Sequence, residues 1–146
     1  MSVIQQVLKS SPSYAPFILR IPLGIILMAH GAQKLFGWFG GGGLQGTGQF
    51  MSSLGLEPGV LMALLAGSGE FFGGLFLLLG LLTRPSALVV AFTMLVAILS
   101  VHIDNGLFLA NGGYEFGLAL LAMAMSLLAS GAGRFGFDNL LAKKYQ

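Results

Sequence analysis

Long apolar runs, separated by short polar or glycine-rich segments, dominate the hydrophobic pattern of this 146-residue chain. Their lengths are close to the roughly 20 residues that an α-helix needs to cross about 30 Å of hydrocarbon. We therefore predict an all-α protein, an integral membrane four-helix bundle, with residues 1–146 forming a single transmembrane domain. The predicted spans cover residues 16–36, 58–82, 85–103 and 114–132.

The composition favours the same class of protein. Hydrophobic residues make up 55% of the chain and charged residues only 8%, whereas a soluble domain carries about 25% charged residues. The lipid bilayer is thus the expected surrounding, and the small, scattered net charge of +2 gives no basic patch for nucleic acid. The chain has no cysteine, which excludes disulfides, iron–sulfur ligation and thiolate metal sites within it.

The basic residues are distributed unevenly about the predicted spans. With four spans, both termini lie on the same side as the turn between the second and third spans. That side collects Lys9, Arg20, Arg84, Arg134, Lys143 and Lys144, and the other side has Lys34. The positive-inside rule then predicts cytoplasmic termini, with the loops at 37–57 and 104–113 on the outer side.

The first outer loop has its own pattern. Glycines at 40–43 are followed by Thr47, a plausible helix N-cap, and by Phe50, Met51 and Leu54 at helical spacing. We expect a short helix lying at the outer membrane interface.

Three other charged residues have simple interpretations. Arg20 lies about one turn inside the cytoplasmic boundary, where its long stem can reach the headgroups as an anchor. Asp138 follows the last span and is expected to be solvated. Glu57 precedes Pro58 and fits the favourable negative charge at a helix N-terminus.

Glu70 is the only charged residue between Pro58 and Leu82. An ionisable group at that depth is costly and marks a candidate functional site. His30 and Lys34, four residues apart, share a helix face with Gln33 beside them, and Glu70 is their candidate partner. The alternative is that these groups only neutralise each other and determine helix packing.

A second polar group lies at the same outer level, because odd spans run outward and even spans inward. His102 ends the third span, and Asn111, Tyr114 and Glu115 lie at the start of the fourth. The candidate catalytic residues are His30, Glu70 and Glu115. The candidate ligand-binding residues are Gln33, Lys34, His102, Asn111 and Tyr114. We assign no metal ligand.

Four segments carry a resemblance to a known family: HGAQKLFG at 30–37, GEFFGGL at 69–75, LGLLTR at 79–84 and NGGYE at 111–115. In these segments the chain resembles the DoxX family of small bacterial membrane proteins. The resemblance implies a four-helix protein of the bacterial inner (plasma) membrane, described as an oxidoreductase or oxidoreductase subunit. Its relatives are linked to thiosulfate:quinone oxidoreduction, to catechol and quinone detoxification and to oxidative stress. By motif it points to His30, Gln33, Lys34, Glu70 and Glu115.

The leading functional hypothesis is a membrane component of a quinone-linked redox system, with a small organic molecule in the outer half of the bundle. His30 or Lys34 would donate to a carbonyl oxygen, and Glu70 or Glu115 would carry a proton. The sequence has no flavin or nicotinamide fingerprint. A protein partner is therefore expected to supply or accept the electrons.

Other hypotheses remain open at this point. His30 and His102 are the only histidines and could ligate a haem between helices, or a metal together with Glu70 and Glu115. A non-enzymatic chain would be a scaffold for redox partners or a small proton or solute transporter. The small size of the chain is also compatible with a homo-oligomer.

Overall fold

The computed structural model describes residues 2–145, and these residues form helices and turns without a strand. The all-α prediction is confirmed. Three helical segments are long and apolar enough to cross a membrane, namely α2 (Ala15–Phe36), α4 (Gly59–Leu79) and Thr83–Asn105. The last segment consists of α5 (Thr83–Ala97) extended by a π-helical turn, Ile98–His102, and a 3₁₀ turn, Ile103–Asn105. The fourth predicted span corresponds to α6 (Glu115–Ser130), a shorter apolar helix of 16 residues.

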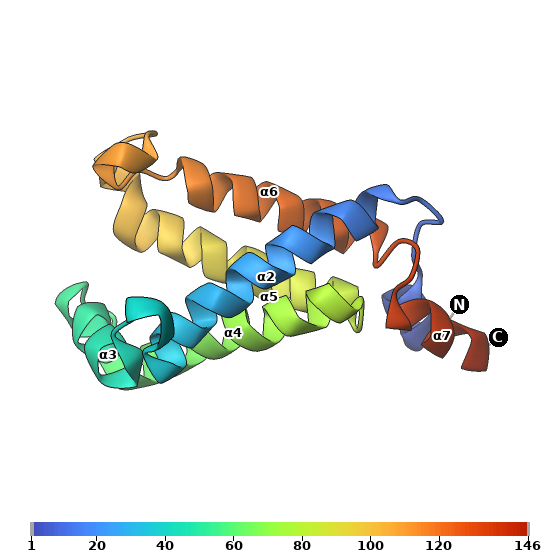
Figure 1. Cartoon of the computed structure of the whole chain (residues 1–146), viewed down its shortest axis with the longest axis horizontal. Coiled ribbons are helices and arrows are strands. Elements are labelled where there is room, and N and C mark those ends of the chain that lie inside the picture. Colours follow the sequence, from blue (N-terminus) through green and yellow to red (C-terminus); the bar gives the residue numbers. More distant parts are fainter. Residues whose placement is uncertain (1, 146) are drawn as a thin grey trace.

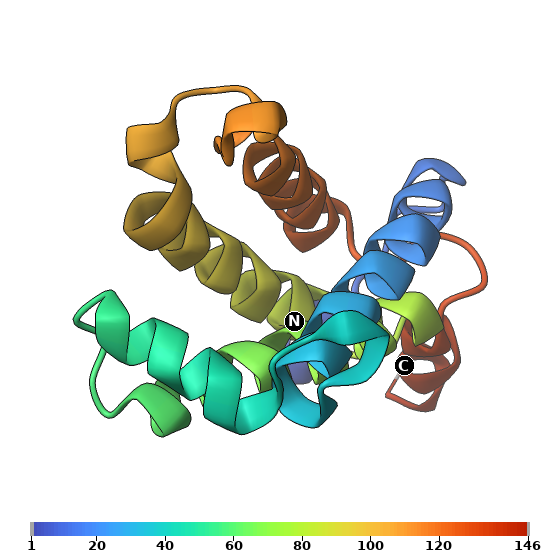
Figure 2. The same cartoon turned by 60° about the vertical axis from the view of Figure 1, so that its left-hand side comes forward.

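The four long helices lie side by side along the long axis of the molecule (Figure 1). Both chain ends lie at one end of this group, which we call the terminal end, with the short helices α1 (Val3–Leu8) and α7 (Phe137–Lys144). Helix α3 (Gly43–Ser53) and the connection from α5 to α6 lie at the opposite end, the loop end. Helix α2 packs mainly on α4, and α5 on α6 (Figure 2).

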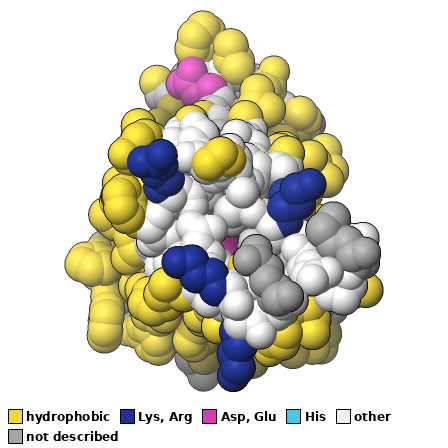
Figure 3. Space-filling model, turned by 90° about the vertical axis from the view of Figure 1, so that its right-hand side faces the viewer, with side chains coloured by type: hydrophobic (Ala, Val, Ile, Leu, Met, Phe, Trp, Pro, Cys, Tyr) yellow, Lys and Arg dark blue, Asp and Glu magenta, His cyan; other side chains and the backbone are white. Residues whose placement is uncertain are grey.

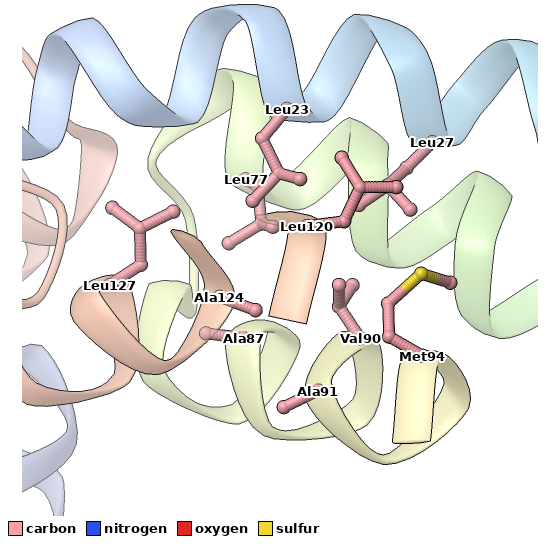
Figure 4. Close-up of a cluster of buried hydrophobic side chains, with 10 residues drawn as sticks. All are labelled: Leu23, Leu27, Leu77, Ala87, Val90, Ala91, Met94, Leu120, Ala124 and Leu127. Carbon is pink, nitrogen blue, oxygen red and sulfur yellow. The ribbon is translucent and has the colours of Figure 1, made fainter. Parts of the chain in front are cut away.

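The core lies where α2, α4, α5 and α6 meet. Its ten buried side chains are aliphatic apart from one methionine (Figure 4). They are Leu23, Leu27, Leu77, Ala87, Val90, Ala91, Met94, Leu120, Ala124 and Leu127. Small alanines on α5 and α6 allow these two helices to approach closely, while leucines from α2 and α4 fill the space between the pairs.

The outer surface of these helices is strongly apolar. Large hydrophobic side chains such as Ile18, Leu65, Phe92 and Leu99 are more than half exposed. A soluble monomer rarely exposes such extended apolar surface, so these side chains face lipid. Viewed from the terminal end, the molecule shows basic side chains around a polar centre, with hydrophobic side chains along its flanks (Figure 3).

Glycines bring α2 and α4 together in two places. A Cβ at Gly24 would lie 2.6 Å from the carbonyl oxygen of Gly74, and one at Gly31 would lie 2.8 Å from that of Gly67. The two contacts are seven residues apart on each helix, which is about two helical turns. They therefore define the register of one antiparallel helix on the other.

The helix in the first loop starts earlier than predicted. It begins at Gly43 after Gly42 as N-cap, so Thr47 lies in its middle and the predicted Thr47 cap is wrong. The reason lies in the preceding turn. Gly37 ends α2 with φ 71°, and Gly41 lies so close to the Gln33 backbone that the chain has already reversed direction by residue 43.

Candidate functional site

An ion pair joins α2 to α4 near the loop end. Lys34 Nζ donates to Glu70 Oε2 at 2.6 Å. The Glu70 residue is 3% exposed, while the Lys34 side chain remains 24% exposed. It is the only ion pair among residues 2–145. The pairing expected from the sequence is thus present, and it neutralises the carboxylate inside the apolar layer.

The glycine contacts explain why this pair can form. Gly31 and Gly67 lie within one turn of Lys34 and Glu70 respectively, and a Cβ on Gly67 would meet Lys34 Cβ at 3.1 Å. Larger residues would separate the two helix backbones at this level. The lysine and the glutamate meet because the helices are almost in backbone contact.

His30 and Gln33 do not share the partner of Lys34. The half-buried His30 ring lies 6.0 Å, centroid to centroid, from the Phe116 ring of α6. Gln33 Nε2 instead donates to the Phe39 carbonyl oxygen at 3.3 Å. The expectation that all three side chains meet one partner is therefore wrong for Gln33, which stabilises the turn after α2, while His30 extends the site toward α6.

The second predicted group builds the connection between α5 and α6. His102 Nδ1 donates to the Gly112 carbonyl oxygen at 2.7 Å, since a carbonyl oxygen can only accept a hydrogen bond. Glu115 Oε1 accepts from the Leu109 backbone N–H at 2.6 Å. Asn111 ends a 3₁₀ turn in this connection and Tyr114 is the N-cap of α6. These residues shape the loop end beside α6.

The two groups remain separate in the part of the chain that is described. No hydrogen bond or ion pair there joins Lys34 or Glu70 to His102 or Glu115. Residues 2–145 also bring no three His, Asp or Glu side chains into a metal-binding arrangement. The metal site that combines both histidines with Glu70 and Glu115 is therefore wrong in its geometry. Haem ligation by the two histidines stays a prediction.

Arg20 does not reach outward as predicted. It is 1% exposed, and its guanidinium donates to four backbone carbonyl oxygens of two chain segments. These acceptors are Leu77 at 3.4 Å, Leu78 at 2.5 Å, Ala132 at 3.0 Å and Arg134 at 3.3 Å. The physical reason is that the carbonyls of Leu78, Ala132 and Arg134, at the end of α4 and after α6, have no backbone donor among the described residues, so the fork of donors turns toward them.

Asp138 is also buried, and the prediction that it is solvated is wrong. Its two oxygens accept from the backbone N–H groups of Leu82 at 2.7 Å and Thr83 at 2.9 Å. Its own N–H donates to the Gly80 carbonyl oxygen at 2.9 Å. The carboxylate thereby caps the start of α5 from the first turn of α7. We call Arg20 and Asp138 together the terminal hub.

The sequence carried a signal for one hub residue only. Arg20 is an intramembrane charge like Glu70, and the same reasoning about cost would have marked it as buried and bonded. Asp138 had no such signal, because its partners are backbone groups 55 and 56 residues away.

The described residues form at least two cavities that open on the surface. One of about 490 Å³ lies at the terminal end beside Lys9 and Arg84. The other, of about 240 Å³, is apolar and lies between α4 and α5 beside Phe72 and Val89. Neither is lined by Lys34 or Glu70. The accessible part of the ion pair is the Lys34 side chain, which is 24% exposed.

Taken together, the fold and the buried ion pair define an α-helical membrane protein with several spanning helices and a charged pair between two of them. The chain belongs to the DoxX family, whose model matches residues 15–103. It is 32% identical over 113 residues to "Putative oxidoreductase CatD" of Bacillus subtilis (strain 168), which covers 77% of this chain and 78% of the relative.

Two further relatives align over nearly the whole chain. "Inner membrane protein YqjF" of Escherichia coli (strain K12) is 32% identical over 144 residues, covering 94% of this chain and 100% of the relative. A Haemophilus influenzae (strain ATCC 51907 / DSM 11121 / KW20 / Rd) protein, named only "Uncharacterized protein", is 32% identical over 144 residues, covering 93% and 96%. No solved structure matches this chain.

Proposed function

We propose that this protein is a membrane component of a quinone-linked redox system, with a quinone-like organic molecule bound beside the Lys34–Glu70 pair. The observation that carries the proposal is the pair itself, a 2.6 Å contact between two charges at the boundary of an apolar layer. A family member named as an oxidoreductase supports the reaction class.

The pair offers the interactions that a quinone needs. The Lys34 ammonium has three N–H donors, of which one is used by Glu70, and the others can reach a carbonyl oxygen. Reduction of a quinone to a quinol takes two electrons and two protons. We assign proton delivery to Glu70 and His30, each of which first takes up a proton that enters from water through Glu115 at the loop end. The two electrons come from a partner protein.

The remaining candidates are assigned to ligand binding. His102, whose Nδ1 bonds the Gly112 carbonyl, would offer its Nε2 to the ligand, and Asn111 and Tyr114 lie in the same connection. Gln33 acts by holding the turn after α2. These roles require that the ligand lies between α2 and the connection from α5 to α6.

We further propose the membrane arrangement. Helix α6 is a fourth span, tilted and completed by neighbouring apolar residues, and α3 lies at the outer interface. The terminal end faces the cytoplasm of a bacterium, because its basic side chains follow the positive-inside rule. A cysteine introduced at Lys143 and one introduced at Gly46 should then react with an impermeant thiol reagent from opposite sides of the inner membrane.

The first experiment is an oxidised-minus-reduced absorbance spectrum of the detergent-purified protein, with its organic extract analysed for quinone. We expect stoichiometric quinone in the wild type and a loss of tenfold or more in Glu70→Gln. Glu57→Gln is the matched control, because that carboxylate is exposed and bonds only Ser52 and Gly59. Two results together overturn the proposal. The first is a difference spectrum without a redox band and an extract without quinone, and the second is full redox activity in a Glu70→Gln, His30→Ala double variant.

The closeness of the ion pair also favours a second candidate function. Two charges that neutralise each other can serve helix packing alone, and the chain would then be a scaffold for redox partners. A scaffold predicts that Glu70→Gln lowers recovery of the partner complex and leaves turnover per recovered complex unchanged.

A further inference from the structure

The larger cavity, of about 490 Å³, has no role in the proposed redox site. It lies at the terminal end between the connection from α1 to α2, the first turn of α5 and the last turn of α6. Its polar lining includes Lys9, Arg84 and the hydroxyl-bearing residues Ser10, Ser11 and Ser130, and no carboxylate lines it. Two positive charges and several hydroxyl groups are thus concentrated around one opening.

The position of Arg84 is determined by the backbone around the cavity. Its Nε donates to the Lys9 carbonyl oxygen at 3.1 Å and its Nη1 to the Leu128 carbonyl oxygen at 2.7 Å. The guanidinium therefore connects three segments, and within residues 2–145 the structure shows no hydrogen bond from its Nη2. A planar guanidinium held in this way is well suited to a phosphate oxygen.

Among the residues that the structure describes, neither cation of the cavity has an acidic partner. The only ion pair among residues 2–145 joins Lys34 to Glu70, toward the other end of the molecule. Lys9 is exposed and carries its charge at the rim. An anion would thus find two positive charges here, one held in place by backbone carbonyls and one exposed at the rim.

The depth of the cavity in the membrane follows from the helices that border it. Helix α5 begins at Thr83 and α6 ends at Ser130, so the opening lies where the apolar spans stop. This is the level of lipid headgroups. The surrounding face carries other basic side chains (Figure 3), and basic pockets at this level attract anionic headgroups.

We infer that this cavity binds a phosphate group, with the headgroup of an anionic phospholipid as its natural source. Arg84 Nη2 donates to one phosphate oxygen, and Lys9 neutralises the charge from the rim. The Ser11 hydroxyl contributes a neutral donor, since those of Ser10 and Ser130 already donate to backbone carbonyl oxygens. Free phosphate shares this chemistry. The inference is independent of the proposed redox function, because it concerns the opposite end of the molecule.

Lipid binding to the purified full-length chain tests the inference. Phosphatidylglycerol and phosphatidylcholine are titrated into detergent micelles, and bound lipid is counted by native mass spectrometry. We expect the wild type to prefer phosphatidylglycerol, and Lys9→Gln to weaken that binding about fivefold. The matched control is Lys143→Gln, which removes the same charge from exposed helix α7 outside the cavity and should change binding less than twofold.

Two further arms complete the test. Arg84→Lys keeps the charge but loses the fixed fork, and should also weaken binding; Lys9→Gln carries the test if this variant does not fold. Displacement of phosphatidylglycerol by millimolar inorganic phosphate, absent in Lys9→Gln, would support the site with free phosphate as a source. Equal effects of Lys9→Gln and Lys143→Gln, or equal binding of the two lipids, overturn the inference.

Discussion

The two ends of this molecule bury charge in different ways. Arg20 at the terminal end and Glu70 near the loop end are both almost fully buried. The partners of Arg20 are backbone carbonyls of two chain segments, whereas Glu70 is held by one flexible side chain, Lys34. Backbone partners cannot leave without unfolding, but a lysine can turn toward a ligand. From this comparison we predict that the terminal hub is structural and that the ion pair is exchangeable.

Removal of the hub cation should have the largest effect. Arg20→Met leaves up to three carbonyl oxygens without a donor, because that of Leu77 still accepts from the Gly80 backbone N–H, and each such group costs about 1–3 kcal/mol when buried. We expect a loss of at least about 3 kcal/mol in unfolding free energy, measured by circular dichroism during denaturation in mixed micelles. Arg20→Lys, which keeps one donor group, should lose less. A wild-type unfolding curve for Arg20→Met would show that the hub is not structural.

The second-largest loss of stability is expected when α2 is forced away from α4. In Gly31→Ala the new Cβ would lie 2.5 Å from the Phe71 backbone nitrogen, so the helices must move apart at a cost of about 1–3 kcal/mol. Gly46→Ala in α3 is the control, because its Cβ meets nothing within 4 Å. The same denaturation assay should leave Gly46→Ala at or above wild-type stability. Equal stability of the two variants would contradict the close contact.

Replacement of Asp138, the acidic residue of the terminal hub, should lower stability moderately. Asp138→Asn replaces one of two acceptor oxygens by an N–H donor that faces a backbone N–H, which should cost about 1–3 kcal/mol. Asp104→Asn at an exposed position is the matched control and should stay within about 0.5 kcal/mol. Hydrogen exchange should localise the change to the start of α5. Protection unchanged there would exclude the capping role.

Removal of both charges of the ion pair should affect stability least. The Lys34→Met, Glu70→Gln double variant leaves no uncompensated charge, so its unfolding free energy should stay within about 1 kcal/mol of wild type. Lys34→Met alone leaves the carboxylate unpaired and should be the less stable variant. If the pair is exchangeable, the double variant folds but loses quinone binding. A stable double variant that still binds quinone would place the ligand elsewhere.

More of the structure could be predicted from the sequence near the loop end of the molecule than at the terminal end. The first and second spans, predicted at 16–36 and 58–82, appear as Ala15–Phe36 and Gly59–Leu79, since apolar runs that long have few alternatives. Glu70 was also predicted as a candidate partner of Lys34, because a lone charge in an apolar span needs an opposite charge nearby. The hub was missed, because a pattern of side chains does not reveal which backbone groups lack a partner.

By itself, the sequence determined a helical membrane protein, the approximate limits of its long helices and the need to neutralise Glu70. Those features depend on local hydrophobicity and on the cost of an unpaired charge in lipid. The tertiary structure decided the rest: the glycine contacts that bring Lys34 to Glu70, the inward turn of Arg20 and the burial of Asp138 against the start of α5. These contacts join residues 36 to 58 positions apart, and only the packed helices determine which backbone groups then face one another.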